Sequence, residues 1–161
     1  MTNQLSGELG RLLDLYDERR RSEKERVLRL KTDGEAFLNA FADLRRNVIR
    51  PVFEQAGEVL KLRGHSFAVI QEEYACDAAG KTTEASISLR IKPSGSTRLD
   101  DELPSLCIAT RHYNKTVWIN SGEAPRAGGL AGAAGAFALD KVTRQLVEDE
   151  MIAFVARVVA S

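Results

Sequence analysis

The sequence has 161 residues, of which 23 are Lys or Arg and 23 are Asp or Glu, so its formal net charge at neutral pH is zero. A chain of this length can form one domain that buries roughly 70% of the surface of its unfolded state. The charge balance excludes a global electrostatic field of the kind that attracts nucleic acid or anionic membranes, so any such binding has to be local.

The two cysteines, Cys76 and Cys107, are too few for a disulfide framework, and no Cys-x-x-Cys or histidine pair accompanies them to form a zinc site. The N-terminal residues reach a charged run before an apolar block forms, so they do not resemble a signal peptide. No stretch approaches the roughly 18 consecutive apolar residues of a membrane span. We therefore expect a cytoplasmic protein with reduced thiols that uses no membrane, metal or cofactor.

A narrow apolar stripe, the N-terminal stripe, begins the chain at spacings typical of a helix: Leu5, Leu9, Leu12 and Tyr16. Four such residues are too few to support an isolated helix and would be exposed, so the stripe predicts a homodimer formed by helix-to-helix, coiled-coil-like contact. The charged run 17–26 is typical of a solvated helix face, because its acids interleave with its bases. Residues 1–31 thus form a predicted N-terminal helical extension.

A second helix is predicted to begin at Thr32, because Thr32 and Glu35 match a capping box. Its apolar residues recur at helical spacing: Phe37, Phe41, Leu44, Val48, Val52, Val59 and Leu62. Gly64 is a suitable C-terminal stop. Pro51 lies inside this pattern and predicts a kink near residues 47–50.

The centre of the chain favours an antiparallel sheet, since short segments rich in β-branched and aromatic residues alternate with turns: His65–Tyr74, Ala85–Ile91, Ser105–Arg111 and Thr116–Asn120. Asp77–Lys81 is a predicted hairpin connection, and 93–103 a polar exposed loop. Segment 121–136 has five glycines and six alanines but no phosphate-loop or dinucleotide-binding pattern, which favours a flexible linker or lid.

The C-terminal part predicts a short fifth strand at Phe137–Leu139 and then a helix capped by Asp140 or Thr143. The helix has a broad apolar face: Leu146, Val147, Met151, Phe154, Val155 and Val158. The predicted fold class is therefore α+β. Two N-terminal helices precede a four- to five-stranded antiparallel sheet, and the C-terminal helix packs on one sheet face within a domain of residues 32–161.

Catalytic motifs are absent from the sequence, so an enzyme is the less favoured class. His65 and His112 each fall at a strand end beside a turn, where histidine is usually structural. Cys107 and His112 share a strand at odd spacing, which sends their side chains to opposite faces and excludes a nucleophile–base pair within that strand.

Period-two alternation instead predicts that Trp118 points away from the C-terminal helix, on a sheet face with little charge. The candidate binding residues on that face are Tyr74, Arg90, Arg111 and Trp118. Arg90 and Arg111 are expected on adjacent rows of this face. Arginine and aromatic side chains are enriched where protein partners dock.

These residues favour a noncatalytic, homo-oligomeric adaptor that self-associates and binds a protein partner through the outer sheet face and the N-terminal helices. The alternative is a small-molecule enzyme or a sensor of an anionic ligand, with segment 121–136 as the lid. Nucleic-acid binding through Arg45, Arg46 and Arg50 is disfavoured, because no aromatic stacking platform accompanies them.

Overall fold

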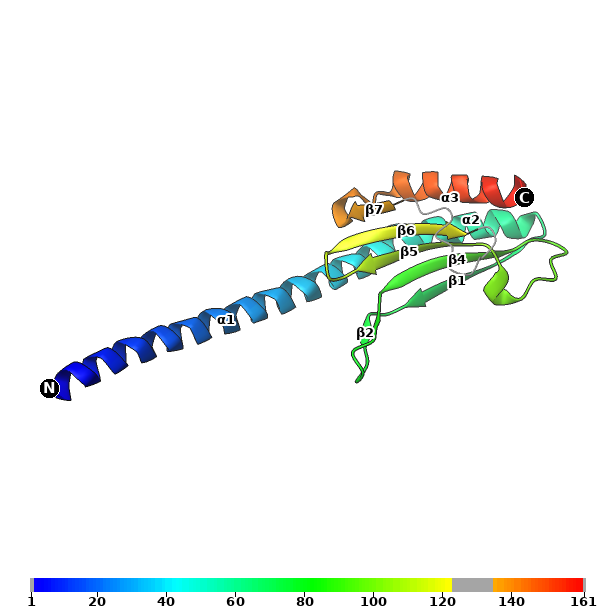
Figure 1. The fold of residues 1–161 in the computed structure, drawn as a ribbon. Coiled ribbons are helices and arrows are strands. Elements are labelled where there is room, and N and C mark those ends of the chain that lie inside the picture. The colour runs from blue at the N-terminus through cyan, green and yellow to red at the C-terminus, as the bar shows by residue number, and fades with distance from the viewer. Residues whose placement is uncertain (1, 123–134, 161) are drawn as a thin grey trace. The chain divides into compact units, whose positions relative to one another are not determined.

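The computed structural model describes residues 2–122 and 135–160 and divides into two compact units, Met1–Ala36 and Phe37–Ser161. Its elements are a long N-terminal helix, a five-stranded antiparallel sheet, a second small sheet and a C-terminal helix (Figure 1). The predicted α+β class is confirmed. Most of the predicted lid, residues 123–134, lies outside the described residues, and the ends of that segment belong to strands.

The first helix, α1, spans Thr2–Leu44, so the predicted helix start at Thr32 is wrong. The Thr32 hydroxyl donates a 2.9 Å hydrogen bond to the carbonyl oxygen of Leu28, one turn earlier, and does not cap a new helix. This bond requires residues 28–32 to be helical already. The preceding run of Arg, Glu, Lys and Leu consists of strong helix formers, and its propensity carries the helix through the capping-box pattern.

A π-helical turn, η1, spans Arg45–Ile49 and joins α1 to α2, which spans Arg50–Leu62. The wider π spacing is seen at Arg50, whose N–H donates to the carbonyl of Arg45, five residues earlier. Pro51 follows in the first turn of α2, where a missing N–H costs least. The irregularity predicted at 47–50 is thus a π turn.

Helix α2 ends at a glycine, as the sequence predicts. Gly64 has a φ of +89°, a conformation that residues with a Cβ rarely adopt. The Gly64 N–H donates to the carbonyl of Lys61, and the His65 N–H donates to that of Leu60. This pair of bonds is a Schellman motif, which satisfies the last helical carbonyls and turns the chain back toward the sheet.

The main sheet has the strand order β1-β4-β5-β6-β7, and every neighbouring pair is antiparallel. Its strands are β1 (Ser66–Glu72), β4 (Ser86–Lys92), β5 (Ser105–Arg111), β6 (Thr116–Gly122) and β7 (Gly135–Ala138). Strand β7 confirms the predicted fifth strand at an edge of the sheet. Strand β1 lies at the other edge.

A small hairpin separates β1 from β4, made of β2 (Ala75–Cys76) and β3 (Thr82–Thr83). In its turn, one carboxylate oxygen of Asp77 accepts hydrogen bonds from the N–H groups of Ala79 and Lys81 at 3.0 and 2.8 Å. Asp side chains commonly stabilise turns in this way. The hairpin predicted at 77–81 is confirmed.

The last helix, α3, spans Arg144–Ala160 and follows a 3-10 turn at Leu139–Lys141. The Thr143 hydroxyl accepts a 3.2 Å hydrogen bond from the N–H of Leu146, which makes Thr143 the N-cap rather than Asp140.

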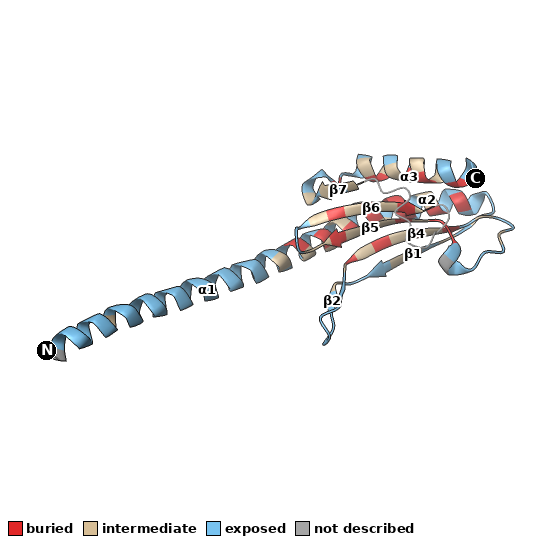
Figure 2. Ribbon diagram, viewed as in Figure 1, coloured by how far each residue is buried: buried red, intermediate tan, exposed pale blue. Residues whose placement is uncertain are grey.

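The core of the C-terminal unit lies between one face of the sheet and helices α2 and α3. Residues of β4, β5 and β6 alternate between buried and partly exposed, as Figure 2 shows by its banded strands. The fully buried large side chains are Phe41, Ile49, Phe53, Ile87, Leu89, Ile91, Leu106, Ile108, Val117, Ile119, Val147 and Phe154. Among the described residues, no helix has both the length and the apolar character to cross a membrane.

Candidate functional site

The sheet face opposite the core, here called the outer face, carries mainly small and polar side chains. The strand alternation and register assign to it Ala68, Ile70, Ser86, Ser88, Arg90, Cys107, Ala109, Arg111, Trp118 and Asn120. Trp118 lies between the fully buried Val117 and Ile119 and is itself only partly buried. The prediction that Trp118 points away from the core is confirmed.

Three side chains of the β5–β6 hairpin form a cluster at one end of the outer face: Arg111, Tyr113 and Trp118. We call them the arginine–aromatic cluster. The guanidinium carbon of Arg111 lies 3.9 Å from the centre of the Trp118 ring, close enough for a cation–π interaction. The Arg111 guanidinium also donates to the Tyr113 hydroxyl at 3.4 Å, and Tyr113 is 72% exposed.

The indole of Trp118 is oriented by a second contact. Its Nε1–H donates to the hydroxyl of Thr116 at 3.2 Å, and that hydroxyl donates in turn to the side-chain oxygen of Asn114 at 2.6 Å. The chain of bonds ties the ring to the β5–β6 turn. The cluster therefore presents an indole, a phenol and a guanidinium in a defined arrangement.

Arg90 does not belong to this cluster. The register places Arg90 opposite Ser105 and places Arg111 six residues further along β5. At about 3.3 Å per residue, the two arginines are roughly 20 Å apart along the sheet. The prediction that they lie on adjacent rows is wrong, because the 93–104 loop returns the chain with Ser105, not Arg111, beside Arg90.

Tyr74 is also placed elsewhere. It packs against the core cluster, and its ring centre lies 4.6 Å from that of His112. The main-chain N–H of His112 donates to a carboxylate oxygen of Glu84 at 2.8 Å. Tyr74 thus takes part in the packing at the strand ends, next to His112.

The other histidine has a loop contact. The Nδ1 of His65 accepts a 2.9 Å hydrogen bond from the N–H of Ser94, which ties the start of β1 to the loop after β4. Both histidines therefore sit in contacts that hold loops and strand ends.

The Cys107 thiol lies on the outer face beside Ser88, its neighbour in the register. Burial raises the pKa of Cys107 above its ordinary value, the charge of Glu72 raises it further, and a hydrogen bond with the Ser88 side chain partly offsets this. A thiol held in its protonated form is a weak nucleophile. Opposite it on β6, the buried Oδ1 of Asn120 has no hydrogen-bond partner among the described residues.

Each of the three arginines considered for nucleic-acid binding pairs with a carboxylate of the same chain. Arg46 pairs with Asp43 at 2.7 Å, and Arg50 pairs with Glu54 at 2.8 Å. Arg45 is buried. Its Nη1 donates at 3.1 Å to the carbonyl oxygens of Glu72 and Ser86, and its Nη2 pairs with the Glu73 carboxylate.

The role of Arg45 is not evident from composition or motif. A signal exists in the helical period, because Arg45 follows the buried Phe41 by four residues and so falls on the apolar face of the helix. Its guanidinium carbon lies 5.7 Å from the Phe41 ring centre. Arg45 is a structural tie between the π turn and the sheet.

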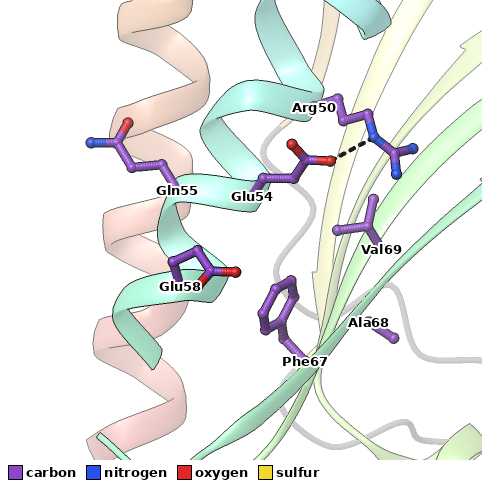
Figure 3. A pocket seen from close by; sticks show the side chains of 7 residues that line it. All are labelled: Arg50, Glu54, Gln55, Glu58, Phe67, Ala68 and Val69. Atoms are coloured by element: carbon purple, nitrogen blue, oxygen red, sulfur yellow. Dashed lines mark hydrogen bonds and ion pairs between the residues drawn. The ribbon is translucent and has the colours of Figure 1, made fainter. Parts of the chain in front are cut away.

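Helix α2 contributes residues to a cavity beside β1 and to a second cavity that is lined mainly by α3 and the neighbouring loops. One, of about 460 Å³, lies between α2 and the edge strand β1 (Figure 3) and is lined by Arg50, Glu54, Gln55, Glu58, Phe67, Ala68 and Val69. The other, of about 340 Å³, is mainly apolar and is lined by Leu60, His65, Ile91, Pro93, Val155, Val158 and Val159. The cavity of about 460 Å³ therefore lies between the charged face of α2 and the edge strand β1.

Within residues 2–122 and 135–160, no group of three or more His, Cys, Asp or Glu side chains could hold a metal ion. Comparison of the chain with known protein families, with curated proteins and with solved structures gives no match.

Proposed function

We propose that this chain is a noncatalytic interaction protein that self-associates and binds a protein partner. The observation that carries the proposal is the exposure of the N-terminal stripe. Leu5 is 64% exposed and Leu12 is 53% exposed, and Leu9 and Tyr16 are exposed as well. Further exposed apolar side chains of the same helix are Leu13, Leu15, Val27, Leu28 and Leu30.

Contact with another helix would remove this apolar surface from water. Full burial of one leucine side chain stabilises a contact by about 1.5–3 kcal/mol, so burial of the stripe on both helices would oppose the entropic cost of association. Their spacing matches that of helix-to-helix seams. The stripe therefore supports a docking role for α1.

The seam positions after Tyr16 explain how such a contact could be selective. The same spacing continues through Arg19, Glu23 and Arg26 before it reaches Leu30. Charged residues at seam positions lower the stability of a helix pair but determine its register and its partner. A partner helix with complementary charges would satisfy them.

The arginine–aromatic cluster supports a second contact. Arginine, tryptophan and tyrosine dominate binding energy at many protein interfaces, because each combines a large apolar surface with directed hydrogen bonds. The alternative, an enzyme or sensor for an anionic ligand, requires several cations around one point. The separation of Arg90 from Arg111 leaves one guanidinium in the cluster, which favours the protein partner.

Full-length protein with Leu12→Glu tests the proposal, and Leu28→Glu is the matched control, because Leu28 is 62% exposed and points away from the stripe on the helix. Sedimentation velocity and quantitative co-purification of bound proteins are measured for both. We expect Leu12→Glu to lower the oligomeric state and to release proteins that the control retains. Identical sedimentation and identical bound proteins in both variants would contradict the proposal.

A further inference from the structure

We infer that the free edge of β1 pairs with β1 of a second copy of this chain, so that two five-stranded sheets join into one antiparallel sheet. The interface lies in the C-terminal unit and does not involve the N-terminal stripe. It is therefore independent of the proposed function and can hold or fail separately.

Strand β1 has the features of a pairing edge. It is bonded to β4 on one side and, among the described residues, has no strand on the other. Its sequence, Ser66–Glu72, contains no proline and no lysine, the residues that commonly protect exposed edges. Seven residues are enough for a regular ladder.

The hydrogen bonds of β4 show which groups of β1 face outward. The Ile91 N–H donates to the carbonyl of Pro104, and the Thr110 N–H donates to that of Ala85, so odd-numbered residues of β4 point toward β5. Even-numbered residues of β4 therefore point toward β1. The register pairs them with even-numbered residues of β1, so the main-chain groups of Phe67, Val69 and Gln71 point to the free edge.

Pairing about a twofold axis at Val69 uses all of these groups. It places Val69 opposite its own copy and Phe67 opposite Gln71, and the three residues of each copy then form about six interchain hydrogen bonds. The contact is isologous, the type found in most homodimers. The partly buried Phe67 and Val69 would become covered on the core side.

Helix α2 provides charge complementarity along the same edge. The chain reverses at Gly64, and a Cβ on Gly57 would lie 2.3 Å from the Phe67 ring, so the end of α2 lies beside the start of β1. Arg50 lies two turns earlier, toward the end of β1, and Figure 3 shows Arg50, Glu54 and Glu58 following the groove. The twofold axis reverses the second helix and brings each Arg50 to the acidic stretch 54–58 of the other.

This charge complementarity is the reason to expect that β1 pairs with a second copy of this chain. Within the described residues, Glu54 pairs with Arg50, whereas Glu58 forms no ion pair. Arg50 of a second copy can pair with Glu58 across the groove. An unrelated strand could use the edge bonds but would not provide this arginine.

The test uses the full-length chain with Leu9→Glu and Leu12→Glu, which removes association through the N-terminal stripe. Sedimentation velocity across a range of concentrations should still show a monomer–dimer equilibrium. In that background Arg50→Glu should weaken dimerisation about tenfold or more, and Arg50→Glu combined with Glu58→Arg should restore it. A background protein that is monomeric at all concentrations, or a dimer that is indifferent to Arg50→Glu, would overturn the inference.

Gln71→Pro supplies a second test, because it removes an N–H that faces the free edge and leaves the bonds to β4 in place. Gln71→Thr is its control, since it keeps the N–H. We expect dimer loss for proline alone, with unchanged far-ultraviolet circular dichroism. Amide exchange followed by NMR should show protection of Phe67, Val69 and Gln71 only at dimer-forming concentrations. Rapid exchange of these amides in the dimer would show that another surface holds it and would reject β1 pairing.

Discussion

The guanidinium Nη1 of Arg45 lies 3.1 Å from the carbonyl oxygen of Ser86, and this contact joins the π turn to the first residue of β4. The same nitrogen also donates a hydrogen bond to the carbonyl oxygen of Glu72 at the end of β1. One buried side chain thus holds the end of the β1–β4 pair to the helix. The ion pair between Arg45 and Glu73 adds little, because the Glu73 side chain is 72% exposed and solvent screens it.

Arg45→Met should therefore destabilise the protein. The two carbonyls lose a charged donor, and we expect the free energy of unfolding to fall by about 1–3 kcal/mol. Urea denaturation measures the loss. Arg46→Met is the neighbouring control, since the Arg46 side chain is 70% exposed. Equal stability of the two variants would show that the buried contacts of Arg45 contribute nothing measurable.

Gly57→Ala should conflict with Phe67. A methyl group at Gly57 would lie 2.3–2.5 Å from three ring carbons of Phe67, so the ring has to move. This cost of about 1–3 kcal/mol opposes the gain of about 1 kcal/mol that alanine brings to a helix interior.

The double-mutant cycle with Phe67→Ala isolates the conflict between residues 57 and 67. Removal of the ring leaves room for the methyl group, so Gly57→Ala should be more favourable in the Phe67→Ala background than in the wild type. Additive changes in unfolding free energy would contradict the close approach of α2 and β1.

The raised pKa of Cys107 predicts a pH-dependent contribution to stability. The folded protein holds the thiol proton more tightly than the unfolded chain does, so the contribution is fully present below the ordinary thiol pKa of about 8.5. It is lost as the pH rises through the folded-state pKa. Cys107→Ala should lose less stability than the wild type between neutral and alkaline pH.

Cys76→Ser is the control for this measurement, because Cys76 is exposed. It should follow the wild-type dependence of melting temperature on pH. Alkylation should also modify Cys76 faster than Cys107 near neutral pH, since only the thiolate reacts readily. A Cys107 that reacts as fast as Cys76 would be inconsistent with its burial.

Arg111→Ala should change the environment of the single tryptophan. Removal of the guanidinium that stacks on Trp118 exposes the indole to water, and the fluorescence maximum should move to longer wavelength. Partner binding should weaken by about 1–2 kcal/mol if the cluster is part of an interface. Arg90→Ala is the matched control at the other end of the outer face and should alter neither fluorescence nor binding.

The sequence by itself determined the parts of this protein that depend on local spacing and turn chemistry. Alternation in 85–91 identified β4 and its core face. Gly64 marked the end of a helix, because glycine readily adopts a positive φ. Thr143 marked the start of a helix, because its hydroxyl can accept a hydrogen bond from a free N–H of the first turn. The N-terminal stripe could also be identified from the sequence, because recognising leucines at helical spacing requires no information about long-range contacts.

Only the tertiary structure decided which distant residues meet. The length of the 93–104 loop does not reveal the β4–β5 register, and the register is what separates Arg90 from Arg111 and leaves the latter with Trp118. Thr32 matched a cap, yet neighbouring helix propensity prevailed. In the sequence, Arg45 belongs to a basic run. In the fold it is buried and donates hydrogen bonds to two strand carbonyls, which lie 27 and 41 residues further along the chain, and no local pattern predicts these contacts.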